Sequence, residues 1–275
     1  MSDPQHKDKV ESVAAQQLLA GTRSSSVPLA IRALAANLLQ DVACPPTDLD
    51  AVAGKLSATV TAADIFGSGE LRRRADGYDI VYAKDLALSR RRFTIAHELA
   101  HIAIIQAGPR APTSGKEVER LCDLIAVEIL MPWQIFESAI PRHPNLGDVF
   151  VLAKQFQTSL VATSQRCTEI RPLTVLEVAK GRITWCVGAL RRSTALQDAS
   201  LLEHVRRACD GHSGSAALYL NGNSSLLPAR VEYQSLGRTG RALCMLKRIS
   251  ASEARAALHD SDIVGPEAGT PPRTC

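Results

Sequence analysis

The chain has 275 residues, of which 45% are apolar and 22% charged, and its formal net charge is +4. This length and apolar content suit one large domain or two modest ones, and so mild a positive charge does not by itself indicate a nucleic-acid-binding protein. No stretch approaches the roughly 20 apolar residues that span a bilayer, and the seven irregularly spaced cysteines form no C-x-x-C pair, so we expect a cytoplasmic protein without a membrane partner, a disulfide framework or a zinc knuckle.

The first part of the chain predicts a flexible segment followed by two helices. Residues 1–25 are polar and end in a serine-rich run, a composition typical of a mobile segment. Residues 28–43 carry apolar side chains at helical spacing, and a Cys-Pro-Pro break follows them. Residues 47–58 then predict a second helix, with Thr47 as its N-cap.

Two short strands and two longer helices are predicted next. The β-like runs are Thr59–Thr61 and Tyr78–Tyr82, separated by Gly, Asp and Arg residues. A long helix should begin at the N-cap Ser89 and run to about Gln106, before a Gly-Pro pair. The next helix, over residues 117–131, is stopped by Pro132.

The second half of the chain predicts a helical unit and then a small mixed region. Residues 141–190 read as a helical unit followed by a hairpin that turns at Lys180-Gly181. Residues 152–167 within it have the pattern of a helix-turn-helix. Residues 191–262 predict a small α/β accessory region, and residues 263–275 a disordered tail.

Three basic features raise the question of DNA binding. Gln165 and Arg166 lie late in the second helix of the helix-turn-helix pattern, where a DNA contact would be expected. Arginine triplets occur at 72–74 and 90–92 and could meet an acidic partner. We favour a helical unit that packs on its neighbour or docks a protein, and solvated arginines, over direct DNA contact.

A metal-binding motif lies in the predicted helix 89–106. His97 and His101 are four residues apart, so a helix presents both imidazoles on one face. Glu98 lies about 100° round the helix from His97 and is well placed for a water on the metal. The alternative is a buried helix with two satisfied histidines, but its apolar surroundings would leave both imidazoles in need of partners.

The next helix supplies what the motif lacks. A catalytic zinc site has three protein ligands, and Glu119 is a candidate for the third. Asp123 shares the face of Glu119 and can accept the free N–H of a zinc histidine. These carboxylates could also form an ordinary solvated face, but the apolar residues around them keep this stripe beside the core, which favours a metal site.

Two segments together resemble the ImmA/IrrE family of zinc metallopeptidases. RRRFTIAHELAH, residues 90–101, and ERLCDLIAVEILMP, residues 119–132, match the family's two helical motifs nearly throughout. The likeness extends over roughly residues 28–187. Ala100 and Ile125 depart from the usual Gly and Phe, and both substitutions keep a residue that can pack there.

Residues of the family's active site can be matched one by one to positions in this sequence. The resemblance implies His97, His101 and Glu119 as zinc ligands and Glu98 as the catalytic glutamate, with Asp123 where members have Asn or Asp. Zinc is the expected cofactor, one per chain, although manganese can occupy similar sites.

The resemblance also implies a fold and a role. The fold is α+β, a gluzincin-like minimal zincin core over residues 26–140, followed by the helix-turn-helix-like unit and the small α/β region. Some longer relatives carry a sensor-like C-terminal domain. Family members cleave helix-turn-helix (XRE-type) repressors, so we expect a zinc endopeptidase that derepresses a stress-response or mobile-element regulon, with a repressor as its protein substrate.

Three questions stay open on the sequence. The transition-state oxyanion needs a donor, for which Tyr78, Tyr82 and an arginine of 90–92 are candidates. Residues 77–82 are a candidate edge strand for an extended substrate, or else a core strand. The rival functions are a DNA- or protein-binding regulator with a structural metal, which would have no use for Glu98, and a toxin–antitoxin component of the same superfamily.

Overall fold

The computed structural model describes residues 13–107, 115–180, 182–188, 199–221, 226–237 and 240–261. It divides into two compact units. The first comprises the chain up to Pro141 together with Phe150–Thr163, and the second comprises Arg142–Val149 together with the chain from Ser164 onward. Helices and two separate sheets occur together, so the predicted α+β class is confirmed. No helix among the described residues is long and apolar enough to cross a membrane.

The first unit begins with a helix where we predicted a flexible segment. Its helices are α1 (Val13–Thr22), α2 (Val27–Leu39), α3 (Leu49–Lys55), α4 (Leu88–Ala107), α5 (Lys116–Leu130) and α6 (Trp133–Ala139). Ala15 and Leu18 of α1 are buried, because the apolar residues of this stretch share one helical face. The polar run before them, which led to the prediction, lies outside the described residues.

The start of α3 is capped by a different residue from the one predicted. The Asp48 carboxylate accepts hydrogen bonds from the backbone N–H groups of Asp50 and Ala51, at 3.1 and 3.0 Å. Thr47 is buried, and its hydroxyl donates to the Ile129 carbonyl at 2.7 Å. Thr47 therefore joins the loop before α3 to the end of α5.

A three-stranded sheet covers one side of α4. Its strands are β1 (Ala58–Ala63), β2 (Gly69–Arg73) and β3 (Tyr78–Ala83), in the order β1-β3-β2. β3 pairs in parallel with β1 and antiparallel with β2. The predicted edge strand, β3, is therefore the central strand of the sheet, because both of its edges are already paired. The two outer strands, β1 and β2, each have a free edge, and β2 is a strand that we did not predict.

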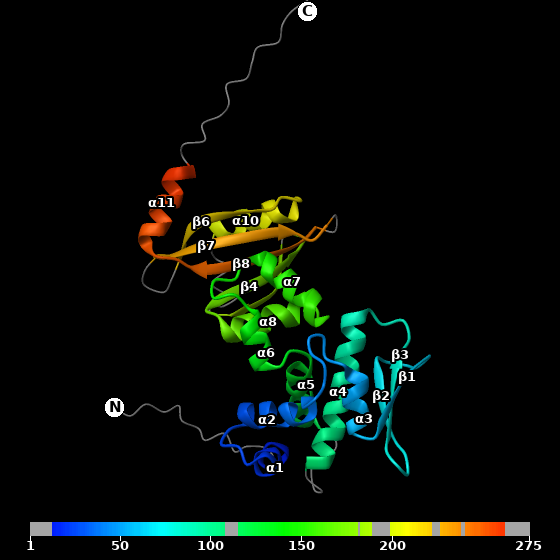
Figure 1. Cartoon of the computed structure of the whole chain (residues 1–275). Coiled ribbons are helices and arrows are strands. Elements are labelled where there is room, and N and C mark those ends of the chain that lie inside the picture. The colour runs from blue at the N-terminus through cyan, green and yellow to red at the C-terminus, as the bar shows by residue number, and fades with distance from the viewer. Residues whose placement is uncertain are drawn as a thin grey trace, which may run out of the picture. The chain divides into compact units, whose positions relative to one another are not determined.

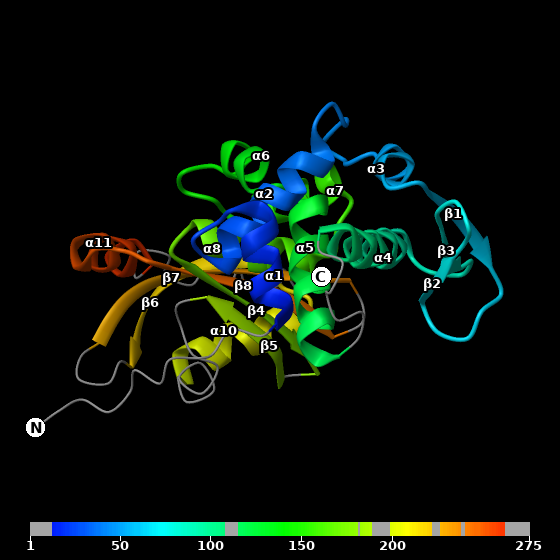
Figure 2. The same cartoon turned by 90° about the horizontal axis from the view of Figure 1, so that it is seen from below.

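Helix α4 lies between α5 and this sheet, as both views show (Figures 1 and 2). Leu99, Ala100 and Ile102 of α4 are fully buried, and so are Leu121, Cys122 and Ile125 of α5 to within 1%. A helix that is enclosed on two sides is held in position along its length, which fixes the directions of the polar side chains that remain.

The two predicted helices of the helix-turn-helix pattern are present as α7 (Leu146–Phe156) and α8 (Leu160–Ile170). The chain turns between them at Gln157, whose φ of +54° lies in the left-handed region. However, the two units divide α7 and α8 between them. Residues 141–190 therefore do not form the separate unit that we predicted.

The second unit is built on a five-stranded antiparallel sheet in the order β5-β4-β8-β7-β6. Its elements are β4 (Leu173–Ala179), β5 (Arg182–Gly188), α10 (Ala199–Cys209), β6 (Gly214–Asn221), β7 (Leu226–Ser235), β8 (Arg241–Arg248) and α11 (Ala251–Ser261). The predicted hairpin is β4 and β5, which turn at Lys180; Gly181 lies outside the described residues. We assigned this hairpin to the helical unit, but β4 pairs with β8 along its whole length.

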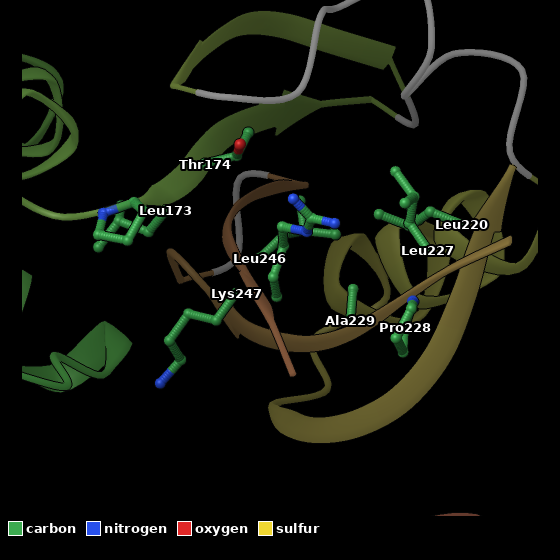
Figure 3. A pocket seen from close by; sticks show the side chains of 10 residues that line it. Leu173, Thr174, Leu220, Leu227, Pro228, Ala229, Leu246 and Lys247 are labelled. Carbon is green, nitrogen blue, oxygen red and sulfur yellow. The ribbon is translucent and has the colours of Figure 1, made fainter. Parts of the chain in front are cut away.

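The core of the second unit lies between this sheet and α10. Leu201, Val205 and Ala208 of α10 pack with Leu176 of β4 and Val231 of β7. At one end of the sheet, side chains of β4, β6, β7 and β8 line a small, mainly apolar pocket: Leu173, Thr174, Leu220, Leu227, Ala229, Leu246 and their neighbours (Figure 3). The predicted tail, residues 263–275, lies outside the described residues.

Candidate metal centre

Helix α4 directs two histidines to one point. The Nε2 atoms of His97 and His101 are 3.2 Å apart. Only 16% and 14% of the two side chains are exposed, since the buried faces of α4 hold the helix between α5 and the sheet. Two imidazole nitrogens at this separation can share one proton, or both can direct their lone pairs to one ion.

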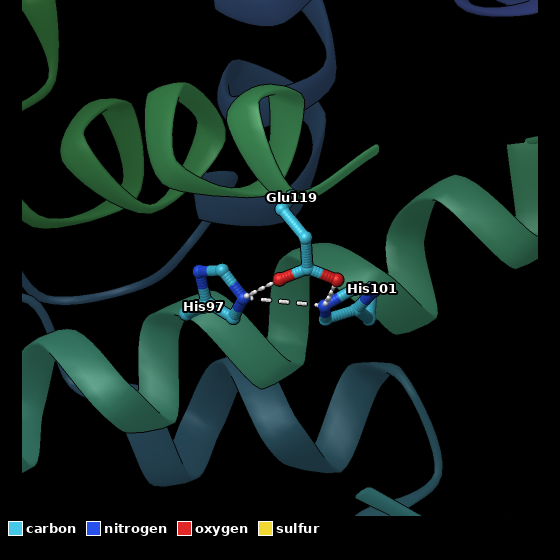
Figure 4. Close-up of side chains that lie close together, drawn as sticks. All are labelled: His97, His101 and Glu119. Carbon is cyan, nitrogen blue, oxygen red and sulfur yellow. Dashed lines mark hydrogen bonds and ion pairs between the residues drawn. The ribbon is translucent and has the colours of Figure 1, made fainter. Parts of the chain in front are cut away.

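The Glu119 carboxylate, in the first turns of α5, meets both rings. Its Oε2 lies 3.2 Å from His97 Nε2 and its Oε1 3.5 Å from His101 Nε2. Figure 4 shows the carboxylate descending from α5 between the two rings. The structure thus brings together the three residues that the sequence proposed as ligands. Among the described residues, these three form a cluster that could hold a metal ion.

The spacing of these atoms fits a tetrahedral metal ion. Ligands about 2.0–2.1 Å from a zinc ion at tetrahedral angles are about 3.3–3.4 Å from one another. The two imidazole nitrogens, 3.2 Å apart, are close to that value. His97 Nε2 lies 3.2 Å from Glu119 Oε2, and His101 Nε2 lies 3.5 Å from the other carboxylate oxygen, Oε1. Two imidazoles and one carboxylate are also the donor set of a zinc site that leaves its fourth position open.

Asp123 orients one of the histidines. His97 Nδ1 lies 2.9 Å from Asp123 Oδ1, one helical turn beyond Glu119. A carboxylate in this position keeps the proton on Nδ1, so the lone pair of Nε2 faces His101 and Glu119. The hydrogen bond that we predicted between Asp123 and a candidate ligand histidine is therefore present.

The protonation tendencies of the site suit both a metal and a base. Burial lowers the pKa of His101, and neighbouring His97 lowers it further, so its neutral, metal-binding form is favoured. Burial raises the pKa of the Glu98 carboxyl, and the charges of Glu119 and Glu70 add to this, while His97 opposes it. A carboxylate with a raised pKa is a better proton acceptor near neutral pH.

Glu98 lines two adjoining pockets. One is also lined by Leu71, Arg73, Tyr78, His101 and Ile105. The other is also lined by Ser68, Gly69, Arg90, Phe93, Thr94, His97 and Asp123. Glu98 and the two histidines therefore stand in a cleft between α4 and strand β2.

The two tyrosines that we considered have different positions. Tyr78 lines the pocket that holds Glu98 and His101. Tyr82 instead packs against Arg91, whose guanidinium carbon lies 5.9 Å from the centre of the tyrosine ring. Tyr78 is thus the tyrosine that the structure brings to the site.

Strand β2 supplies site residues that the sequence did not reveal. A β-carbon on Gly69 would lie 2.3 Å from Thr94 Cγ2 and 3.2 Å from Glu98 Oε1. Glycine therefore allows the backbone of β2 to approach the base closely. Only a Gly-x-Gly pair before a charged run marks this strand in the sequence, and that signal is too common to predict a site.

Of the two residues of the helix-turn-helix pattern that we considered for a DNA contact, Gln165 is exposed but Arg166 is buried. Arg166 is 4% exposed, and its Nη1 is 3.0 Å from Glu169 Oε2. The neighbouring outward residues of α8 include Val161, of which 40% is exposed. Since phosphate contacts need accessible cations, this geometry does not favour DNA recognition by Arg166.

Comparisons with known proteins bear on the family and the fold. A solved structure described as a Mycobacterium tuberculosis transcriptional regulator has the same fold at 16% sequence identity, with a TM-score of 0.51 over 91% of this chain and 84% of that one. No curated protein matches the chain. Residues 53–168 match the model of the peptidase M78 family, described as the IrrE N-terminal-like domain. The resemblance drawn from the two helical motifs is confirmed: through residues 53–168, the chain carries an IrrE N-terminal-like domain of the peptidase M78 family.

Proposed function

We propose that this chain is a zinc-dependent endopeptidase that cleaves a helix-turn-helix transcriptional repressor. The observation that carries the proposal is the convergence of His97, His101 and Glu119 on one point, with Glu98 beside them. A metal that only held the fold together would need no acid–base group in its cleft. The repressor as substrate rests on the family resemblance, and the regulatory role of the Mycobacterium tuberculosis protein is in keeping with it.

His97, His101 and Glu119 would hold the ion, and Asp123 would keep His97 in the tautomer that ligates. A bound zinc ion polarises the scissile carbonyl and makes water acidic enough to attack it. Glu98 accepts the proton of that water and returns it to the leaving amine, since its raised pKa suits both steps. The Tyr78 hydroxyl is the candidate donor to the oxyanion, because Tyr78 lines the same pocket.

The substrate would bind as an added strand along β2. β2 is one of the two edge strands of its sheet, and it is the one that lines the cleft, passing Glu98 at Gly69 and Leu71. An extended polypeptide can satisfy the unpaired backbone groups of such an edge, which presents the scissile bond to the cleft. We therefore propose residues 69–73, instead of residues 77–82, as the strand that pairs with an extended substrate.

Co-expression with a helix-turn-helix repressor encoded in the same genome, tried first with any that is encoded beside this gene, tests the proposal. The wild-type chain should cleave the repressor, and Glu98→Gln should not, while its zinc content stays unchanged. Glu203→Gln is a matched control, because Glu203 is an exposed carboxylate of α10, paired with Arg206 and not among the residues of the two pockets. Equal cleavage by wild type and Glu98→Gln would show that this cleft does not catalyse the reaction.

A further inference from the structure

We propose that Arg73 and Arg90 select polypeptides with acidic side chains on both sides of the scissile bond. This inference rests on the proposed peptidase function and adds the substrate's chemistry to it. The two arginines belong to the triplets 72–74 and 90–92, and each lines one of the two pockets that share Glu98.

The alternation of strand β2 singles out Arg73 within its triplet. Positions 69, 71 and 73 of β2 face α4, since Leu71 and Arg73 line the pocket of Glu98 and a β-carbon at position 69 would lie 3.2 Å from Glu98 Oε1. Arg72 lies on the opposite face, where its Nη2 is 2.9 Å from Glu70 Oε2. Arg74 has its Nε 3.4 Å from Asp79 Oδ1.

Arg90 is singled out in the same way at the start of α4. Arg92 turns away from the cleft and donates to the Thr47 carbonyl at 2.7 Å. Arg91 lies over the ring of Tyr82. Arg90 lines the pocket of His97 and Glu98, where its Nη2 makes one long contact of 3.4 Å with Ser68 Oγ.

Neither pocket-lining arginine has a carboxylate partner. Among the residues that the structure describes, no acidic oxygen comes within ion-pair distance of Arg73 or Arg90, although Arg72 and Arg74 both have one. An arginine carries five N–H donors in a fork that matches a carboxylate. Each pocket therefore has an arginine beside Glu98 that is available to bind a carboxylate of the substrate.

The charge of the cleft supports an acidic substrate once the metal is bound. Glu98, Glu119 and Asp123 are the carboxylates at the site, and a divalent ion offsets two of their three negative charges. The guanidinium groups of Arg73 and Arg90 then outnumber the remaining charge, which leaves the cleft positive. Complementary charge across an interface favours the matching partner and disfavours its opposite.

The geometry also sets the spacing of the acidic side chains. Arg73 lies at one end of β2, and Arg90 lies beside Ser68 and Gly69 at the other. Gly69 and Arg73 are four strand positions apart, about 13 Å. A peptide paired with β2 would therefore place its two carboxylates about four residues apart, with the scissile bond between them near Glu98.

Peptide selection on an inactive chain tests this directly. Zinc-loaded Glu98→Gln would be used to capture random dodecapeptides from a display library, so that binding is read without cleavage. The captured pool should be enriched in Asp and Glu at two positions about four apart. Combining Arg73→Gln with Arg90→Gln in that chain should remove the enrichment, whereas Arg72→Gln with Arg91→Gln, two arginines of the same triplets, should preserve it.

The preference can then be measured in the active chain. Since exposed ion pairs contribute up to about 1 kcal/mol, each single substitution should lower kcat/KM for the best acidic peptide about threefold to fivefold, and raised salt should reduce the difference. Arg73→Glu should reverse the preference at one position from Glu to Lys. A selected pool without acidic residues, or one that the double variant leaves unchanged, would overturn the inference. If the wild-type chain cleaved no peptide at all, that result would count against the peptidase function. Failure of the acidic preference and failure of the peptidase function can therefore be told apart.

Discussion

Gly69 lies against Glu98 so closely that a β-carbon at position 69 would stand 3.2 Å from Glu98 Oε1. Strand β2 therefore forms one wall of the space in which the base would work. The contact joins the sheet to the motif helix at the acid–base group itself, and it makes the position of Glu98 depend on a residue with no side chain.

Gly69→Ala should lower kcat at least tenfold while the zinc content stays unchanged. The added methyl would lie 2.3 Å from Thr94 Cγ2, and because Thr94 is buried, either β2 or the Glu98 side chain must move. Activity on a cleaved substrate and metal analysis of the same preparation measure the two effects. Gly54→Ala is the control, since a β-carbon there meets nothing within 4 Å; equal loss in both variants would refute a local effect at Glu98.

Asp123→Asn should weaken zinc binding about 10-fold to 100-fold without unfolding the chain. The amide no longer holds the proton of His97 Nδ1 as a carboxylate does, so the ring is free to adopt the wrong tautomer. Competition with a chelator measures the affinity. Glu117→Gln, at another exposed carboxylate of α5, should leave it unchanged, and an unaltered affinity in Asp123→Asn would show that this contact does not tune the metal.

Thr47→Val should destabilise the first unit by about 1–2 kcal/mol. The substitution conserves shape but removes the buried 2.7 Å hydrogen bond to the Ile129 carbonyl. Urea denaturation measures the free energy of unfolding. Thr168→Val, which removes a hydroxyl bond on an exposed helical surface, should cost less than about 0.5 kcal/mol; similar losses in the two variants would contradict the role given to Thr47.

The second unit should lose stability as the pH falls from 7 to 5. Burial lowers the pKa of His204 on α10, Arg207 lowers it further, and Glu203 opposes this; the Nδ1 atom is also buried without a hydrogen-bond partner among the described residues. The unfolded chain therefore takes up a proton before the folded chain does. Stability is complete above the unfolded pKa of about 6.5 and declines below it, by less than about 1.4 kcal/mol per pH unit.

His204→Phe provides the matched test, because a phenyl ring can keep the contact with Tyr233, whose ring centre is 5.5 Å away. Denaturation of both chains between pH 7.5 and 5 should show a smaller pH dependence in the variant. Parallel curves would mean that other groups dominate the titration.

The candidate site was predictable from the sequence because its members lie on helices at short, regular spacing. A helix places His97 above His101 and Glu119 above Asp123 whatever surrounds it, so only the meeting of the two helices was left to infer. Strand β2 was missed because GELRR has one apolar residue and no alternation. Its β structure comes from pairing with β3, which is a tertiary effect.

Non-local pairing also explains the remaining errors. The hairpin of β4 and β5 was recognised from its local pattern, but its partner β8 begins more than 50 residues later. Nothing between 173 and 188 indicates that pairing. Likewise, both Thr47 and Asp48 are acceptable caps in isolation, and only the distant Ile129 carbonyl decides between them.

The free edge of β2 has a consequence for the behaviour of the protein in solution. A strand that stays unpaired so that it can receive a polypeptide can equally receive the β2 of another molecule. The charged side chains of Glu70, Arg72 and Arg73 oppose such self-pairing, because charges on an edge strand must stay solvated and a parallel, in-register pair would bring like charges together. Replacing these residues with apolar ones would therefore be expected to cause aggregation, so Arg73, which we propose as a selector of substrate, would also help to keep the protein from binding itself.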